Sequence, residues 1–276
     1  MSEFDAGNFC YYKSSMMSHA SLMGIMGTRF DMVIIGKSKS ESETVWFNIE
    51  SELKRLNRLL NRFDPASEVS KINKIADHQQ IRVSDEMWQI LNNCKFYHQE
   101  TFGLFDITLK NFYAIQFHEH NKAVSFLRSD IHIDFGGYGK GYALKRIKGI
   151  VEDAAVHQCF VDFGNSSILG VGHHPFGDAW KVSIENPFDA GQTADEISLR
   201  DMALSVSGNT PSYSGHIVHP KSGSPETRRK LVSVLMDDPL DAEVLSTVFL
   251  IAAESEKEQL KKSYQTLTQI SKHCSE

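Results

Sequence analysis

A glycine-rich stretch between residues 131 and 151 constrains the fold of this chain more than any other part of the sequence. The run Ile131–Phe135 alternates apolar and polar residues, which predicts a strand. Four glycines follow within six positions, with Lys140 among them. Apolar residues then recur at three- and four-residue intervals, which predicts a helix with one buried face. The stretch therefore predicts a strand, a glycine turn and a helix.

This turn has the composition of an anion-binding loop. Glycine lets the backbone adopt positive φ and approach a ligand closely, and a helix N-terminus offers unpaired N–H groups. Lys140 adds a full positive charge. The spacing is not that of a P-loop, which needs Ser or Thr at position 141, or of a dinucleotide fingerprint, which needs Gly at 142. We expect a loop that holds a phosphate-bearing ligand; the alternative is a structural turn beside an exposed lysine.

A second candidate site lies in the apolar stretch that begins at Asp241. Glu243 and Thr247 are four residues apart, so both side chains lie on one face of the predicted helix. Carboxylate and hydroxyl oxygens suit a hard cation. The alternative is an exposed glutamate in the first helical turn, which the helix dipole favours. The small-residue stretch from Gly164 to Ser167 is a further candidate for binding an anion through backbone N–H groups.

The order of the predicted elements favours an α+β fold. Between residues 158 and 236 several strands follow one another without long intervening helices. This order favours mixed or antiparallel sheets with flanking helices over one doubly wound parallel sheet. A charged helix is predicted from Ser255 to Ser271. Residues 1–20 are polar and are expected to form a flexible segment, and residues 21–276 a single domain, at most divided into two lobes.

The overall composition restricts the partners and the location of the protein. The net charge is −6 and no basic block is present, so we expect no nucleic-acid partner. The four cysteines are widely spaced and form no metal-binding pattern. No run of about 18 apolar residues is present, so we expect no integral membrane segment. Without a recognisable signal peptide the expected location is cytoplasmic, or periplasmic if a leader has been removed.

Several short motifs occur in the same order as in one known family. They are Met26-Gly27-Thr28, the segment from Phe63 to Asn73, Gly103-Leu104-Phe105-Asp106, the stretch from Asp134 to Ala143, Ser207-Gly208-Asn209, the stretch from His216 to Pro225, and Ala242 to Thr247. Through these motifs the chain resembles the FAD:protein FMN transferases of the ApbE family. The resemblance implies an ApbE-like fold with mixed or antiparallel sheets and a cleft for FAD.

The resemblance also implies the reaction. Enzymes of this family carry out protein flavinylation: with Mg²⁺, they transfer the FMN moiety of FAD to a Ser or Thr hydroxyl of an acceptor flavoprotein and release AMP. Such a phosphoryl transfer requires in-line positioning and neutralisation of charge on the phosphate oxygens.

The motifs assign roles to individual residues by resemblance. The residues implied to line the FAD site are Met26, Phe63, Leu104, Phe105, Asp106, Asp134, Lys140 and Ile217. The implied metal ligands are the Gly137 carbonyl and the side chains of Glu243, Ser246 and Thr247. His216 is the candidate for proton transfer at the acceptor hydroxyl, because His can act near neutral pH. Lys140 and Glu243 are the other candidate catalytic residues.

Glu243 departs from the family pattern, which has Asp at this position. The additional methylene moves the carboxylate by about 1.5 Å, and Mg²⁺ tolerates altered geometry poorly. This departure leaves two alternatives open. One is a non-catalytic FAD-binding protein, and the other is an FAD pyrophosphatase that converts FAD to FMN and AMP. Phe63 also replaces the usual Tyr, which keeps the aromatic ring and removes a hydroxyl group.

Overall fold

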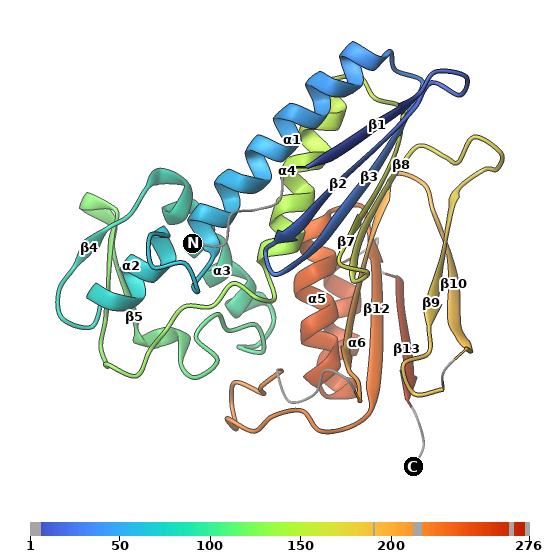
Figure 1. The fold of residues 1–276 in the computed structure, drawn as a ribbon. Helices are drawn as coiled ribbons and strands as arrows, with labels where there is room; N and C mark the ends of the chain where they lie inside the picture. The colour runs from blue at the N-terminus through green and yellow to red at the C-terminus, as the bar shows by residue number, and fades with distance from the viewer. Residues whose placement is uncertain (1–6, 190, 212–216, 265–267, 274–276) are drawn as a thin grey trace.

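The computed structural model describes residues 7–189, 191–211, 217–264 and 268–273. Figure 1 shows a large sheet with helices on one face, a β-ribbon on the other face, and a smaller lobe beside them. In the described residues, eight strands form the large sheet, and all neighbouring strands in it are antiparallel. Their order is β1 (Asn8–Tyr12), β2 (Met17–Ile25), β3 (Thr28–Ile35), β7 (Gln158–Phe163), β8 (Ser167–Val171), β11 (Met202–Asn209), β12 (Lys230–Met236) and β13 (Thr268–His273). The predicted α+β class with antiparallel sheets is confirmed.

Alternation along the strands creates the two faces of this sheet. In β3, Phe30, Met32 and Ile34 are buried, whereas Asp31 and Val33 between them are partly exposed. A period of two places alternate side chains on opposite faces. One face of β3 therefore packs into the core, and the other carries the polar residues Arg29 and Asp31.

Helices α1 (Lys39–Leu60), α4 (Gly139–Asp153) and α5 (Pro239–Ile251) cover the core face of the sheet. α1 begins at Ser38 with a capping box: the Ser38 hydroxyl accepts the Glu41 N–H, and the Glu41 carboxylate accepts the Ser38 N–H. α5 begins at Asp238, with Pro239 in its first turn. α6 (Glu254–Ser263) follows α5.

The smaller lobe contains α2 (Glu68–Ile75), α3 (Asp85–Glu100) and a three-stranded antiparallel sheet of β4 (Ile81–Arg82), β6 (Ala123–Phe126) and β5 (Ile115–His118). Two short 3₁₀ helices flank β5, at Phe112–Ala114 and Glu119–Asn121. One hydrophobic core cluster runs from the large sheet into this lobe and includes Leu22, Leu53 and Ile90. The expected domain boundaries stay a prediction.

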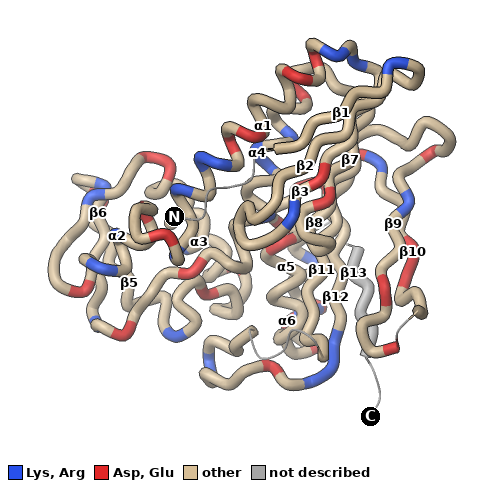
Figure 2. Tube along the Cα trace, viewed as in Figure 1, with Lys and Arg blue, Asp and Glu red and all other residues tan. Residues whose placement is uncertain are grey.

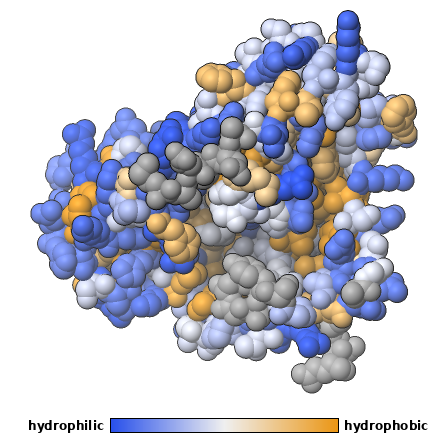
Figure 3. All heavy atoms as spheres, in the orientation of Figure 1, coloured by the Kyte–Doolittle hydropathy of each residue, from blue (hydrophilic) through white to orange (hydrophobic). Residues whose placement is uncertain are grey.

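The β-ribbon of β9 (Trp180–Glu185) and β10 (Thr193–Leu199) lies on the outer face of the sheet. Trp180, Leu199 and Leu204 belong to a second core cluster between ribbon and sheet. Figure 3 shows hydrophobic atoms reaching the surface along this boundary. Figure 2 shows both signs of charge interspersed along the chain.

Two expectations about local structure are wrong, and the structure adds detail to a third. Residues 131–135 are not a strand, because their backbone bonds go elsewhere: the Asn73 amide donates to the Ile133 carbonyl at 2.9 Å and accepts the Ile133 N–H at 2.7 Å. Within residues 1–20, the segment expected to be flexible, residues 8–12 form β1 and residues 17–20 begin β2, where Ser18 and Ala20 are buried. The charged helix ends at Ser263, and residues 268–273 pair with β12.

Candidate functional site

The glycine loop packs directly on α5 at Gly141. A Cβ atom at this position would lie 2.5 Å from the Glu243 Cβ and 2.8 Å from the Pro239 carbonyl oxygen. No side chain fits there, so glycine is required for the first turn of α4 to approach α5 this closely. The contact brings the neighbouring Lys140 to Glu243, 103 positions away in the sequence.

Lys140 and Glu243 form an ion pair at this contact. The Lys140 Nζ donates to the Glu243 Oε1 at 2.5 Å. The Glu243 Oε2 accepts hydrogen bonds from Ser167 Oγ of β8 at 2.6 Å and from Ser205 Oγ of β11 at 3.0 Å. The Glu243 side chain is 5% exposed and the Lys140 side chain 22%. A buried carboxylate requires such a charged partner and hydrogen-bond donors.

A group of hydroxyls extends from Glu243 along the sheet. Ser246 Oγ lies 3.0 Å from Ser205 Oγ and 2.8 Å from Ser207 Oγ. Ser246 and Thr247 both donate to the carbonyl oxygen of Glu243, at 3.0 and 3.3 Å. A Cβ atom on Gly137 would lie 3.4 Å from Thr247 Oγ1. The four residues predicted as metal ligands, Gly137, Glu243, Ser246 and Thr247, are therefore brought together.

The donors of this group are oxygen atoms, the kind of ligand that Mg²⁺ prefers. Among the described residues, no group of three or more His, Cys, Asp or Glu side chains is arranged to hold a metal ion. Glu243 is accompanied instead by the hydroxyls of Ser246 and Thr247, which are oxygen donors. Mg²⁺ prefers oxygen ligands and is often held by one or two carboxylates, with waters and substrate phosphates completing its shell. The residues present thus fit the cation that the sequence implies.

Aromatic and charged residues from the end of α1 lie next to the glycine loop. The Asp134 carboxylate accepts the Gly136 N–H at 2.9 Å and lies 3.1 Å from the Arg62 Nε. The Arg62 guanidinium lies over the Phe63 ring, 4.5 Å from its centroid. Phe63 is 80% exposed, although large aromatic side chains are usually buried. Asp134 and Phe63, both predicted to line the FAD site, are thus connected through Arg62.

Met26 lies beside the first residue of α4, whereas the contact of Ile217 with the FAD site stays a prediction. Met26 occupies the turn between β2 and β3 with φ 47°, and its N–H donates to the Asn57 side chain at 3.2 Å. Its sulfur would lie 3.9 Å from a Cβ atom on Gly139, the first residue of α4. Ile217 is partly buried and packs against the main core. His216, the candidate for proton transfer, lies outside the described residues.

The turn from Leu104 to Asp106 is buried. The Asp106 carboxylate accepts hydrogen bonds from Thr108 N and Oγ1, both at 2.7 Å, and from Phe112 N at 3.0 Å. His98 donates from Nδ1 to the Phe105 carbonyl at 2.8 Å. Leu104 and Phe105 themselves belong to the core. These side chains hold the loop together, and their contact with FAD stays a prediction.

Sequence reasoning did not connect Ser167, Ser205 or Arg62 with this site; Ser167 was expected in an anion-binding loop, and its hydroxyl instead donates to Glu243. Ser205 and Ser207 are two positions apart in an apolar strand, so a period of two already indicates that they share a face. Nothing in the local sequence indicates that this face meets α5.

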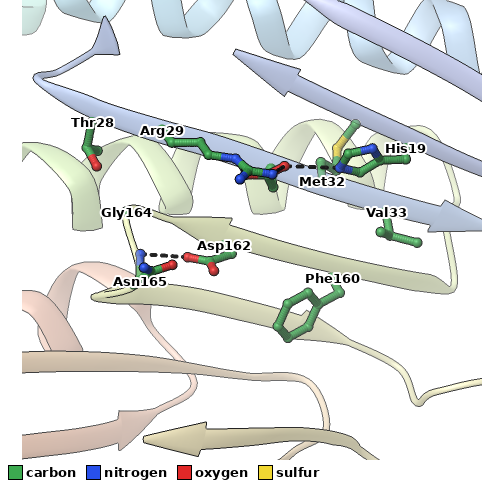
Figure 4. Close-up of a pocket in the computed structure, with 10 residues that line it drawn as sticks. His19, Thr28, Arg29, Met32, Val33, Phe160, Asp162, Gly164 and Asn165 are labelled. Carbon is green, nitrogen blue, oxygen red and sulfur yellow. Dashed lines mark hydrogen bonds and ion pairs between the residues drawn. The ribbon is translucent and has the colours of Figure 1, made fainter. Parts of the chain in front are cut away.

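A separate cleft of about 410 Å³ opens on the outer face of the sheet (Figure 4). There Arg29 and His19 both bind the Asp31 carboxylate, with His19 Nε2 at 3.0 Å. Asp162, the register partner of Asp31 on β7, accepts the Asn165 N–H at 2.8 Å. Burial, and secondarily the charge of Asp31, raise the pKa of the Asp162 carboxyl. The Asn165 N–H, in the loop that was a candidate for binding an anion, thus already donates to the carboxylate of Asp162.

Comparison with known proteins agrees with this architecture. The model of the ApbE family matches residues 26–123 and 109–270. An FAD:protein FMN transferase of Klebsiella pneumoniae (strain 342) is 24% identical over 277 residues, covering 85% of this chain and 79% of that protein. One from Chlamydia pneumoniae is 25% identical over 219 residues, covering 68% and 67%.

Solved structures of ApbE proteins share the fold. The structure of flavin transferase ApbE from Vibrio cholerae has a TM-score of 0.80 at 19% identity and covers 92% of this chain and 93% of that one. The ApbE protein from Thermotoga maritima has a TM-score of 0.74 at 20% identity, covering 97% and 93%. Within the described ranges, no helix has the length and apolar character needed to cross a membrane. Because the family model matches most of the sequence, the chain belongs to the ApbE family.

Proposed function

We propose that this protein is a flavin transferase that moves the FMN moiety of FAD to a Ser or Thr hydroxyl of an acceptor flavoprotein, with Mg²⁺ and release of AMP. Membership of the ApbE family supports the class of enzyme. One observation supports the finer proposal: the phosphate-binding candidate Lys140 and the metal-ligand candidates Glu243, Ser246 and Thr247 meet at the start of α4.

The proposed reaction is a single phosphoryl transfer. The oxygen of the acceptor hydroxyl forms a bond to the FMN phosphorus, and the bond from that phosphorus to the oxygen of AMP breaks. The hydroxyl proton passes to a base, for which His216 is the candidate. AMP leaves with the bridging oxygen, so no oxidant or reductant takes part.

The residues around α4 supply what such a transfer needs. Lys140 and the positive end of the α4 helix dipole are suited to bind the pyrophosphate of FAD. Glu243, Ser246 and Thr247 would hold Mg²⁺, which when bound withdraws charge from the phosphate oxygens. Phe63, exposed and backed by Arg62, offers a surface on which a planar ring can stack.

The two alternatives concern the Glu243 position. In this chain Ser167 and Ser205 bind the carboxylate of the longer side chain, and Gly141 leaves room for it against α4. This accommodation favours a working metal site over a non-catalytic FAD-binding protein. An FAD pyrophosphatase would use the same residues, with water in place of the acceptor hydroxyl.

Mass spectrometry of an acceptor domain tests the proposal. We expect a mass gain equal to FMN after incubation with this protein, FAD and Mg²⁺, and no gain with Glu243→Ala. Lys145→Ala is the matched control. Lys145 also lies on α4, but it binds Asp238 at 2.5 Å and not Glu243 or the serine and threonine hydroxyls around it. Free FMN and AMP without a modified acceptor would instead establish hydrolysis. Bound FAD with neither product would support the non-catalytic alternative.

A further inference from the structure

Lys140 and Glu243 have different partners in the proposed reaction, yet they bind each other in this structure. Lys140 is assigned to the pyrophosphate of FAD, and Glu243 to the divalent cation. The 2.5 Å contact between Nζ and Oε1 satisfies both groups without either ligand. The inference that follows rests on the proposed function.

The Glu243 carboxylate is nearly saturated with donors. Its Oε2 accepts from Ser167 and Ser205, so Oε1 is the oxygen left for Lys140. Both serines are at most 2% exposed, and Ser205 is further held by Ser246 at 3.0 Å. The serines therefore fix the direction of the carboxylate. Lys140, whose side chain is 22% exposed, is the partner with freedom to turn away.

A divalent cation and the Lys140 ammonium compete for the same oxygen. Mg²⁺ binds a carboxylate oxygen at about 2.1 Å. With Nζ 2.5 Å from Oε1, both cations on this oxygen would be less than about 5 Å apart. Like charges this close repel strongly in a buried site, where water screens them poorly. The cation therefore requires Lys140 to leave, and Lys140 requires another anion.

We propose that the Lys140 ammonium occupies the cation position of the ligand-free protein, and that the pyrophosphate of the nucleotide releases it. The nucleotide draws Lys140 from Glu243, and the freed Oε1 accepts the divalent cation. Nucleotide and cation then bind with positive cooperativity, and each binds weakly alone. Such coupling is reciprocal, because each ligand changes the affinity of the other by the same factor.

Titration with Mn²⁺, followed by the electron paramagnetic resonance of free Mn²⁺, measures this coupling. For the unmodified protein we expect FAD at saturation, without acceptor, to raise the Mn²⁺ affinity about tenfold or more. Lys140→Met removes the competing ammonium, so without FAD it should bind Mn²⁺ about tenfold tighter than the unmodified protein, and FAD should raise this affinity by a smaller factor than in the unmodified protein.

Two further variants locate the effect. Glu243→Gln should abolish this Mn²⁺ binding in both the unmodified and the Lys140→Met backgrounds. Lys145→Met should leave the affinity and the coupling unchanged, because its partner Asp238 lies at the N-cap of α5 and the Lys145 side chain is 50% exposed.

The proposal is overturned if Lys140→Met binds Mn²⁺ no more tightly than the unmodified protein, or if Mn²⁺ binding survives in Glu243→Gln. The proposal is also overturned if FAD leaves the Mn²⁺ affinity of the unmodified protein unchanged, which is a coupling factor of one. This measurement needs no variant, so it decides the question even if the Lys140→Met protein fails to fold. FMN transfer to an acceptor with a coupling factor of one would reject this inference and keep the proposed function. If FAD raises the Mn²⁺ affinity but neither FMN transfer nor FAD hydrolysis occurs, the inference is kept and the proposed function is rejected.

Discussion

The two faces of the large sheet carry carboxylates in opposite situations. On the helix-covered face, Glu243 is almost fully buried, and it has a lysine and two serine hydroxyls as partners. On the outer face, Asp162 is partly buried beside a second acid, Asp31, and Arg29 and His19 bind Asp31 rather than Asp162. Burial alone therefore does not determine how a carboxylate behaves.

The difference indicates which of the two regions is better suited to bind ligands. The Glu243 cluster contains the Lys140–Glu243 ion pair, serine hydroxyls and the close contact at Gly141. These groups come from three distant parts of the chain. In the proposed site, the bond between Lys140 and Glu243 is exchanged for a bond from Lys140 to a phosphate and a bond from Glu243 to a cation. The outer cleft has its charges neutralised locally, with Asp31 as the common acceptor.

Loss of Lys140 should destabilise the protein strongly. Lys140→Ala leaves Glu243 buried without a counterion, which should lower the free energy of unfolding by about 3 kcal/mol. It should also weaken FAD binding. Lys145→Ala breaks an exposed pair between the same two helices and should change stability by less than about 1 kcal/mol. Urea unfolding and FAD titration of both variants check this; equal losses would show that the Glu243 environment is not special.

Gly141 should be the next most sensitive position. Gly141→Ala places a methyl group 2.5 Å from the Glu243 Cβ, so α4 and α5 must separate, at a cost of about 2 kcal/mol. Gly149, two turns further along α4, has no neighbouring atom within 4 Å of an added Cβ. Gly149→Ala should therefore stabilise the protein by up to about 1 kcal/mol through helix propensity. Thermal unfolding of both variants would contradict the close-contact explanation if they shifted in the same direction.

Local chemistry was predictable from sequence where one element supplies it. The glycine turn into α4, the shared face of Glu243 and Thr247, and the Ser84 cap of α3 all follow from short spacings. The antiparallel class followed from strands without intervening helices. The family motifs then assigned metal-ligand roles to residues that the structure brings together.

Long-range contacts were not predictable in this way. Ser167 and Ser205 reach Glu243 from strands 76 and 38 positions away, and periodicity carries no information about such pairs. Residues 131–135 alternate like a strand, but the Asn73 side chain takes the place of a neighbouring strand. The buried residues of β2 include Ser18 and Ala20, which are too polar or too small to indicate a core strand from sequence.

A smaller effect is expected for the hydroxyls that bind Glu243. Ser167→Ala removes a hydrogen bond to a carboxylate and should cost about 1.5 kcal/mol. Ser42 is the matched control: it is equally buried, and no described residue bonds to its hydroxyl. Ser42→Ala should be neutral or slightly stabilising, because it removes a buried polar group that lacks a partner. Equal losses in urea unfolding would mean that both serines act only through packing.

The smallest effect on stability is expected on the outer face of the sheet, and it depends on pH. Burial, followed by the charge of Asp31, raises the pKa of Asp162 above its ordinary value of 3.8, so the folded protein binds its proton more tightly than the unfolded chain does. Stability from this group is then present below the unfolded pKa and is lost as the pH rises through the folded pKa. Asp162→Asn removes that loss, and its amide oxygen can still accept the Asn165 N–H. The stability of Asp162→Asn relative to the unmodified protein should therefore increase from pH 3 to pH 7, by less than the Ser167→Ala loss.

Asp178→Asn, at an exposed position before β9, controls for the change in net charge. A flat difference for Asp162→Asn would mean that the outer cleft solvates Asp162 as well as water does, and the contrast between the two faces would then rest on the Glu243 cluster alone.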